Sequence, residues 1–279
     1  MTKKTNGRLI RNIKICDRIY IVGRGDWGGS PALTTKYDCN IYLIDGGREL
    51  ALVDNGETFN LFKLRGNIAS TGLDIRKIKK LLITHNHFDP VAHTWLLKKA
   101  LGAVVFAGKG SYFPLKVGRY FKNGATIKVG DLSLKVYSIS GHTPDGFCFM
   151  TKIDGKKIVF TGDTAIGDQP KNGRGRVGWF NALWGSNMKE YIKSLKFIKA
   201  LDADIILPGH GLPQLTRKKC RSSMVNCLKR INNFGNFKEL ESIIPLAFDR
   251  KGVEKCFSVG ANRQVNLKIK FIKPPIKKK

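Results

Sequence analysis

The sequence predicts an α+β fold in which two β-sheets pack face to face and helices cover their outer faces. Short apolar runs typical of strands alternate with amphipathic helical segments in both halves of the chain. Hydrophobic residues make up 42% and aromatic residues 10% of the sequence, which excludes a disordered chain. We expect a single domain over residues 1–273, with a core at about 18–212, a basic C-terminal extension at 213–273 and a basic tail at 274–279.

The first half is expected to begin with a strand and a glycine-rich loop. The next two runs, 40–45 and 49–54, are joined by Gly46-Gly47, a hairpin signal. Segment 90–101 has the pattern of an amphipathic helix that Gly102 ends. The other expected elements here are strands at 18–22, 80–84 and 103–107, the loop at 23–35 and a helix at 58–70.

The second half repeats this alternation. Two strands, 147–153 and 157–161, are expected around a turn at Asp154-Gly155. The remaining expected elements are strands at 132–139, 205–207 and 265–272 and helices at 188–201 and 213–231.

Composition restricts the class of protein further. No stretch has the apolar length of a membrane span, and the N-terminus lacks an apolar signal core, so we expect a cytoplasmic protein. The six cysteines contain no Cys-x-x-Cys pair, which indicates reduced thiols rather than disulfides.

The chain is strongly basic: 50 basic and 21 acidic residues give a formal net charge of +29. This excess favours anionic partners. The basic residues are spread along the whole chain, which fits a general lysine bias better than a nucleic-acid-binding stripe. We therefore expect a small anionic substrate and keep nucleic acid as a less favoured alternative; the sequence indicates no oligomeric state.

All five histidines lie in short segments that also contain Gly, Pro or Asp, near the ends of expected elements. Neutral imidazole is the commonest metal ligand. His85-x-His87-x-Asp89 follows a buried strand, where residues i and i+2 can reach one ion if the backbone is extended. His142, after another strand, completes a three-histidine site with a position left for water, which is the pattern of catalytic zinc.

A second cluster is expected from Asp89, Asp163 and His210, with Asp163 able to bridge two ions. Two of its members would also suit a purely structural role, since Gly162-Asp163-Thr164 is compatible with a turn and His210 with loop packing.

The ordered motifs His-x-His-x-Asp (85–89), Gly-His-Thr-Pro (141–144), Thr-Gly-Asp-Thr (161–164) and Pro-Gly-His-Gly (208–211) resemble the metallo-β-lactamase superfamily over about 19–211. The resemblance implies a four-layer αββα sandwich of two mixed sheets with the metal site along one edge. It implies His85, His87 and His142 at one metal, Asp89 and His210 at the other, and Asp163 between them. It also implies that Asp54, which equally suits a turn, steadies the histidine loop.

One position departs from that family pattern, which usually has histidine directly after the aspartate, where this chain has Pro90. We therefore expect one tightly held zinc and a second, labile one, with iron or manganese as alternative metals. His93, on the same helical face as Pro90, is an alternative ligand only through a shifted geometry.

Two glycine-rich segments, 23–28 and 173–178, match Gly-x-Gly-x-x-Gly but lack the strand-then-helix context of a dinucleotide site. The family resemblance would place both near the metal. There Trp27 would form an apolar wall of a substrate lip and Arg174 and Arg176 would hold an anionic group; a solvated loop is the simpler alternative.

The function we expect is a metal-dependent hydrolase that uses metal-activated hydroxide on an ester, thioester, lactone or related bond, with Asp89 or Asp163 orienting the nucleophile. Three alternatives remain: a phosphodiesterase or ribonuclease on the same fold, an iron-dependent dioxygenase using His85, His142 and Asp163, and a non-catalytic metal-binding protein.

Overall fold

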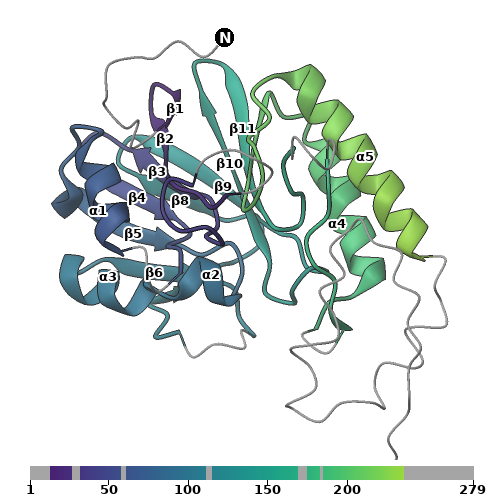
Figure 1. Ribbon diagram of the computed structural model, residues 1–279, viewed down its shortest axis with the longest axis horizontal. Helices are drawn as coiled ribbons and strands as arrows, with labels where there is room; N and C mark the ends of the chain where they lie inside the picture. The colour runs from purple at the N-terminus through teal and green to yellow at the C-terminus, as the bar shows by residue number, and fades with distance from the viewer. Residues whose placement is uncertain are drawn as a thin grey trace, which may run out of the picture.

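Two β-sheets lie back to back at the centre of the molecule, with helices on both outer faces (Figure 1). The computed structural model describes residues 13–26, 32–57, 61–110, 115–168, 175–182 and 185–235. The first sheet runs in chain order through β1 (Ile13–Cys16), β2 (Ile19–Gly23), β3 (Ile41–Asp45), β4 (Leu50–Val53), β5 (Ile78–Leu82), β6 (Val104–Ala107) and β7 (Arg119–Tyr120). The second has the order β12 (Ile205–Pro208), β11 (Lys156–Gly162), β10 (Phe147–Ile153), β9 (Leu132–Ser138) and β8 (Thr126–Val129).

Both sheets are mixed. In the first, β1 to β4 pair antiparallel and β4 to β7 pair parallel. In the second, β12 pairs parallel with β11 and the others are antiparallel. The remaining elements are α1 (Leu61–Ala69), the short 3₁₀ helix η1 (Ile75–Lys77), α2 (Phe88–Val91), α3 (Thr94–Leu101), α4 (Met188–Ala200) and α5 (Arg217–Gly235). The predicted four-layer αββα sandwich is confirmed.

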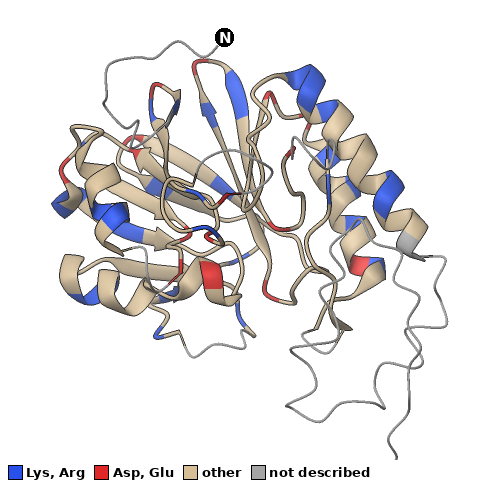
Figure 2. Ribbon diagram, in the orientation of Figure 1, with Lys and Arg blue, Asp and Glu red and all other residues tan. Residues whose placement is uncertain are grey.

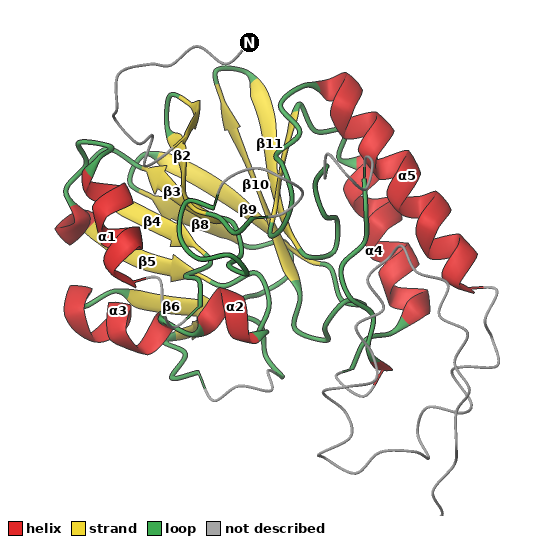
Figure 3. Ribbon diagram, viewed as in Figure 1, coloured by secondary structure: helices red, strands yellow, loops and turns green. Residues whose placement is uncertain are grey.

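The side chains of each strand point alternately to the two faces of its sheet, which divides the hydrophobic core into layers. In β2, Ile19 and Ile21 belong to the cluster between the sheets, whereas Val22 packs in the cluster that contains Leu64 of α1. A third cluster joins the second sheet to α4 and α5, the two helices beside that sheet in Figure 3. Successive side chains of a strand point to opposite faces of the sheet, so one apolar run contributes to two core layers.

The expected single helix at 90–101 is wrong, because the structure has two helices, α2 and α3, separated at Ala92 and His93. In a continuous helix the carbonyl of Pro90 would accept the N–H of Thr94. Here it accepts the N–H of Asn55 at 2.8 Å, so the ladder of helical hydrogen bonds is interrupted. The same contact ties the helix to the end of β4.

Other differences are smaller. The sequence did not predict the strands β1, β7 and β8, and α5 spans 217–235 rather than 213–231. Residues 58–60, the expected strand at 265–272 and the basic tail lie outside the described residues. Among the described cysteines none is in a disulfide.

Lys and Arg residues lie on strands of the sheets and on helices of both outer layers (Figure 2). None of the described helices combines the length and the apolar character needed to cross a membrane.

Candidate metal centre

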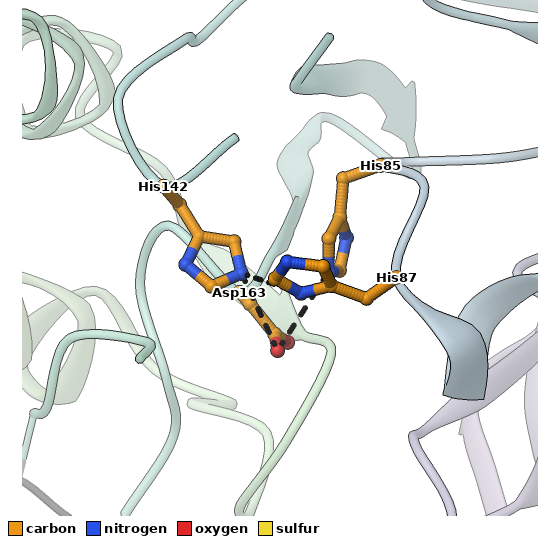
Figure 4. A group of neighbouring side chains, drawn as sticks. All are labelled: His85, His87, His142 and Asp163. Carbon is orange, nitrogen blue, oxygen red and sulfur yellow. Dashed lines mark hydrogen bonds and ion pairs between the residues drawn. The ribbon is translucent and has the colours of Figure 1, made fainter. Parts of the chain in front are cut away.

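Four side chains that follow three different strands converge on one point (Figure 4). His85 and His87 follow β5, His142 follows β9 and Asp163 follows β11, and their ligand atoms all lie within 4.8 Å of one another. His87 Nδ1 is 3.2 Å from His142 Nε2, and Asp163 Oδ2 is 3.8 Å from His85 Nε2 and 3.9 Å from His142 Nε2. Donors each about 2.0–2.1 Å from one tetrahedral ion lie about 3.4 Å apart, so this spacing fits a shared cation.

The protonation of these groups also fits a cation. His142 Nδ1 must donate its proton to the carbonyl oxygen of Trp179, 2.7 Å away, so neutral His142 presents a lone pair at Nε2. Within the described part of the chain, buried His85 Nε2 and Asp163 Oδ1 have no hydrogen-bond partner. A buried polar atom left without a partner costs about 1–3 kcal/mol. A bound divalent cation would give these two atoms the partner that they lack.

Asp54, at the end of β4, acts on His85 through Thr84. Thr84 donates from its backbone N–H and from Oγ1 to the Asp54 carboxylate, each over 2.8 Å. Since the Oγ1 proton is used in this way, His85 Nδ1, 2.9 Å from Oγ1, must be the donor in that contact. His85 is therefore held with its Nε2 lone pair directed at the other ligands, the role that the family resemblance implies for Asp54.

The second predicted cluster also comes together. Asp89, Asp163 and His210 have ligand atoms within 4.8 Å of one another. His210 Nε2 lies 2.8 Å from Asp89 Oδ2 and 3.3 Å from Asp163 Oδ2. Because Asp163 belongs to both groups, it can bridge them. This second group contains a single imidazole, as expected from Pro90.

The loop that carries His210 is held by polar residues of β3 and the segment before it. Asn40 Nδ2 donates to the carbonyl oxygens of Pro208 and Gly211, and the Tyr42 hydroxyl donates to Pro208. Gly209 is required at its position because a Cβ there would lie 2.2 Å from Asp163 Oδ1.

Burial dominates the electrostatics of the three imidazoles. It lowers the pKa of His85 well below its ordinary value, lowers that of His87, and lowers the pKa of His142 to about 3. All three are thus neutral near pH 7, the form that binds a cation.

His210 behaves in the opposite way. Burial lowers its pKa, but the negative charge of Asp163 and hydrogen bonds to Asp163 and Asp89 outweigh burial and place that pKa well above the ordinary value. Burial raises the pKa of Asp163, but the neighbouring imidazoles, His210 first, outweigh it and lower the pKa. A proton on His210 Nε2 therefore compensates the two carboxylates.

Two further predictions need correction. Among the described residues, His93 belongs to neither ligand group, and its side chain is fully buried at the start of α3, where the helix break has placed it. Arg176 is 7% exposed and is paired through its backbone with Ile166, so it is not part of an open substrate lip. Trp27 and Arg174, the other two lip residues, lie outside the described residues.

The sequence interpretation missed the roles of Thr84, Asn40, Tyr42 and the backbone carbonyl of Trp179. Thr84 was readable as a polar residue at the end of a buried strand, directly before the first histidine. The other three act through contacts between distant segments, which no local pattern reveals.

A sequence profile described as the metallo-β-lactamase superfamily matches residues 34–210. The chain belongs to this superfamily. The match covers every residue of both ligand groups, from His85 to His210.

Curated relatives of the chain differ in their described activities. It is 27% identical over 188 residues to the atrochrysone carboxyl ACP thioesterase of Aspergillus fumigatus, covering 66% of this chain and 54% of the relative. It is 27% identical over 195 residues to the β-lactamase-like protein 2 homolog of Caenorhabditis elegans, covering 66% and 59%. A hydroxyacylglutathione hydrolase of Francisella tularensis is 32% identical over 130 residues, covering 46% and 47%. The chain therefore spans about half the length of these relatives.

Solved metallo-β-lactamases share the fold. BJP-1 of Bradyrhizobium japonicum, a subclass B3 enzyme, superposes with a TM-score of 0.63 at 19% identity, covering 84% of this chain and 96% of that one. MIM-2 gives a TM-score of 0.62 at 19% identity, covering 82% and 93%. At such identities the likeness concerns the architecture.

Proposed function

We propose that this protein is a metal-dependent hydrolase of a thioester or a related ester. The observation that supports this is the convergence of three neutral imidazoles and one carboxylate on one point, next to the partly exposed side chain of Asp89. The Asp89 side chain is 23% exposed, whereas the side chain of Asp163 is 9% exposed. Substrate would therefore approach from the Asp89 side.

His85, His87, His142 and Asp163 would hold the cation, with zinc the metal that this donor set suits best. When bound, such a cation lowers the pKa of a water molecule and polarises the bond that the water attacks. Because only one imidazole stands beside Asp89 and Asp163 in the second group, we infer a single tight metal and a labile second one.

Asp89 is the residue that we assign as the base that accepts the proton of the attacking water. Asp163 Oδ2 lies within 3.9 Å of three imidazoles and is committed to holding them. Asp89 is the more exposed carboxylate, so it can orient the attacking water and accept its proton. His210 Nε2, 2.8 Å from Asp89 Oδ2, keeps that carboxylate in place.

The substrate class follows from charge and from the relatives. A chain with a formal net charge of +29 attracts anionic substrates. Relatives described as an ACP thioesterase and as hydroxyacylglutathione hydrolases act on thioesters. A small anionic thioester is therefore our first choice, ahead of lactones and phosphodiesters.

The test is a hydrolysis panel on the purified protein supplied with zinc, covering acyl thioesters, aryl esters, a lactone, an aryl phosphodiester and labelled RNA. We expect thioester cleavage that a chelator abolishes. Asp89→Asn should keep bound zinc and lose turnover about 10²–10⁴-fold, the typical contribution of a positioned base. Asp154→Asn, in the exposed turn between β10 and β11, is the matched control and should behave as wild type.

Three results would overturn the proposal. Cleavage of RNA or the phosphodiester alone would indicate a nuclease, and iron in the purified protein together with oxygen consumption would indicate a dioxygenase. No turnover of any compound by zinc-loaded protein would leave a non-catalytic metal-binding protein.

A further inference from the structure

One residue that the catalytic proposal does not use, Trp179, is fixed against the metal centre. The residue before it, Gly178, donates its N–H to the carbonyl oxygen of Asp163 at 2.9 Å. Further along, Ser186 Oγ donates to the carbonyl oxygen of His142 at 2.6 Å. The chain on both sides of Trp179 is thus bound to ligand-bearing loops, which fixes its position.

Trp179 makes two different contacts with the histidines. Its carbonyl oxygen accepts a hydrogen bond from the Nδ1–H of His142 over 2.7 Å. Its ring centroid lies 6.2 Å from that of His87, with the planes inclined at 53°. Any residue could supply the carbonyl contact, because it comes from the backbone. The contact with His142 therefore does not depend on the indole being present.

The indole is a partly exposed ring beside the metal centre. His85 is 3% and His142 is 2% exposed, so neither faces solvent. Phe88, the residue after His87, is 49% exposed, and Trp179 itself is half-buried. The indole therefore offers apolar surface beside His87, a ligand whose own side chain is buried.

We propose that the indole of Trp179 is a specificity-determining wall that receives an apolar or aromatic acyl group of the substrate. This inference rests on the proposed hydrolase function and narrows its substrate class. An aromatic acyl group would pack on the indole. A small hydroxyacyl group would lose water from its hydroxyl against the apolar ring without gaining a hydrogen bond there. Thioesters of apolar or aromatic acids are therefore preferred over hydroxyacyl thioesters.

The first experiment compares phenylacetyl, acetyl and lactoyl thioesters of the same thiol, using wild type, Trp179→Ala and Trp179→Phe. In wild type we expect the highest kcat/KM for the phenylacetyl thioester. Trp179→Ala should lower the phenylacetyl-to-acetyl ratio of kcat/KM about 3- to 10-fold, the usual worth of an aromatic pair. Trp179→Phe should restore much of the ratio. The control, Trp95→Ala, removes a tryptophan that is 55% exposed on α3 and should leave the ratio unchanged.

A binding measurement separates this inference from the proposed function. Calorimetric titration of zinc-loaded protein with phenylacetate and with acetate tests the wall even if no thioester is cleaved. We expect phenylacetate to bind more tightly, and the difference to shrink in Trp179→Ala only. Equal ratios in wild type and Trp179→Ala would overturn the inference. So would loss of zinc from both Trp179 variants, because that would show a purely structural role.

Discussion

The carboxylate of Asp54 accepts two hydrogen bonds from Thr84, one from the backbone N–H and one from Oγ1, each 2.8 Å long. Through Oγ1 the same pair reaches His85 Nδ1. The end of β4 thereby sets the orientation of a ligand that follows β5. This relationship connects the strand pairing of the first sheet directly to the metal centre.

We predict that Thr84→Val weakens zinc binding about 10- to 100-fold, the usual effect of removing a partner behind a ligand. Valine keeps the shape of the side chain but leaves His85 Nδ1 and Asp54 Oδ2 without that hydroxyl. Competition with a chromophoric chelator measures the affinity. Thr126→Val, the same change at an exposed position of β8, should retain wild-type affinity, and equal affinities in both variants would contradict the role of Thr84.

Much of the fold could be predicted because its elements are locally encoded. The strand at 147–153 was predicted at the bounds that β10 has, since its apolar run is bordered by turn residues. The break between α2 and α3 could not be predicted, because its cause is the distant N–H of Asn55 bound to Pro90. The short strand β7 likewise depends on pairing with β6 rather than on its own pattern.

The residues of the site likewise fall into those that local sequence patterns reveal and those that depend on distant contacts. The histidines and Asp163 carry their own motifs, so they were identified before their geometry was known. Residues that act through backbone atoms, such as Trp179, leave no trace in residue type. The resemblance to a family suggested the role of Asp54, but not that Thr84 carries it to His85.

A second prediction concerns Gly178, whose added Cβ would lie 2.2 Å from the carbonyl oxygen of Asp163 and 3.0 Å from His142 Nδ1. We expect Gly178→Ala to displace both ligands and to lower zinc affinity more than Thr84→Val does. The chelator competition assay is again suitable. Gly72→Ala is a demanding control: Gly72 has a φ of +81°, but nothing lies within 4 Å of its added Cβ. That variant should lose some stability and keep its zinc affinity.

A third prediction concerns stoichiometry. After dialysis, wild type should retain about one zinc ion per chain, and Pro90→His should retain about two, because it supplies the imidazole that the second group lacks. Elemental analysis provides the measurement. His93→Gln should match wild type, since His93 belongs to neither ligand group; a fall in zinc content there would show that it does contribute a ligand.

A fourth prediction concerns pH. Burial lowers the pKa of His142 from an ordinary value of 6.5 to about 3. Between these values the unfolded chain binds a proton at this position and the folded chain does not. The free energy of unfolding contributed by His142 therefore falls by about 1.4 kcal/mol for each unit that pH decreases through this range.

Denaturant unfolding in the presence of a chelator, at several pH values from about 6 to about 4, measures this slope. His142→Asn should show a slope shallower by about 1.4 kcal/mol per pH unit than wild type. Identical slopes would mean that the imidazole of His142 is not kept neutral by burial.

The central claim is that His85, His87 and His142 bind one cation together with Asp163. Elemental analysis of purified wild type, of the three single alanine variants and of His93→Ala tests it most directly. The account predicts about one tightly bound metal ion in wild type and His93→Ala, and its loss in each of the other three. Full metal retention in His85→Ala, His87→Ala and His142→Ala would contradict it.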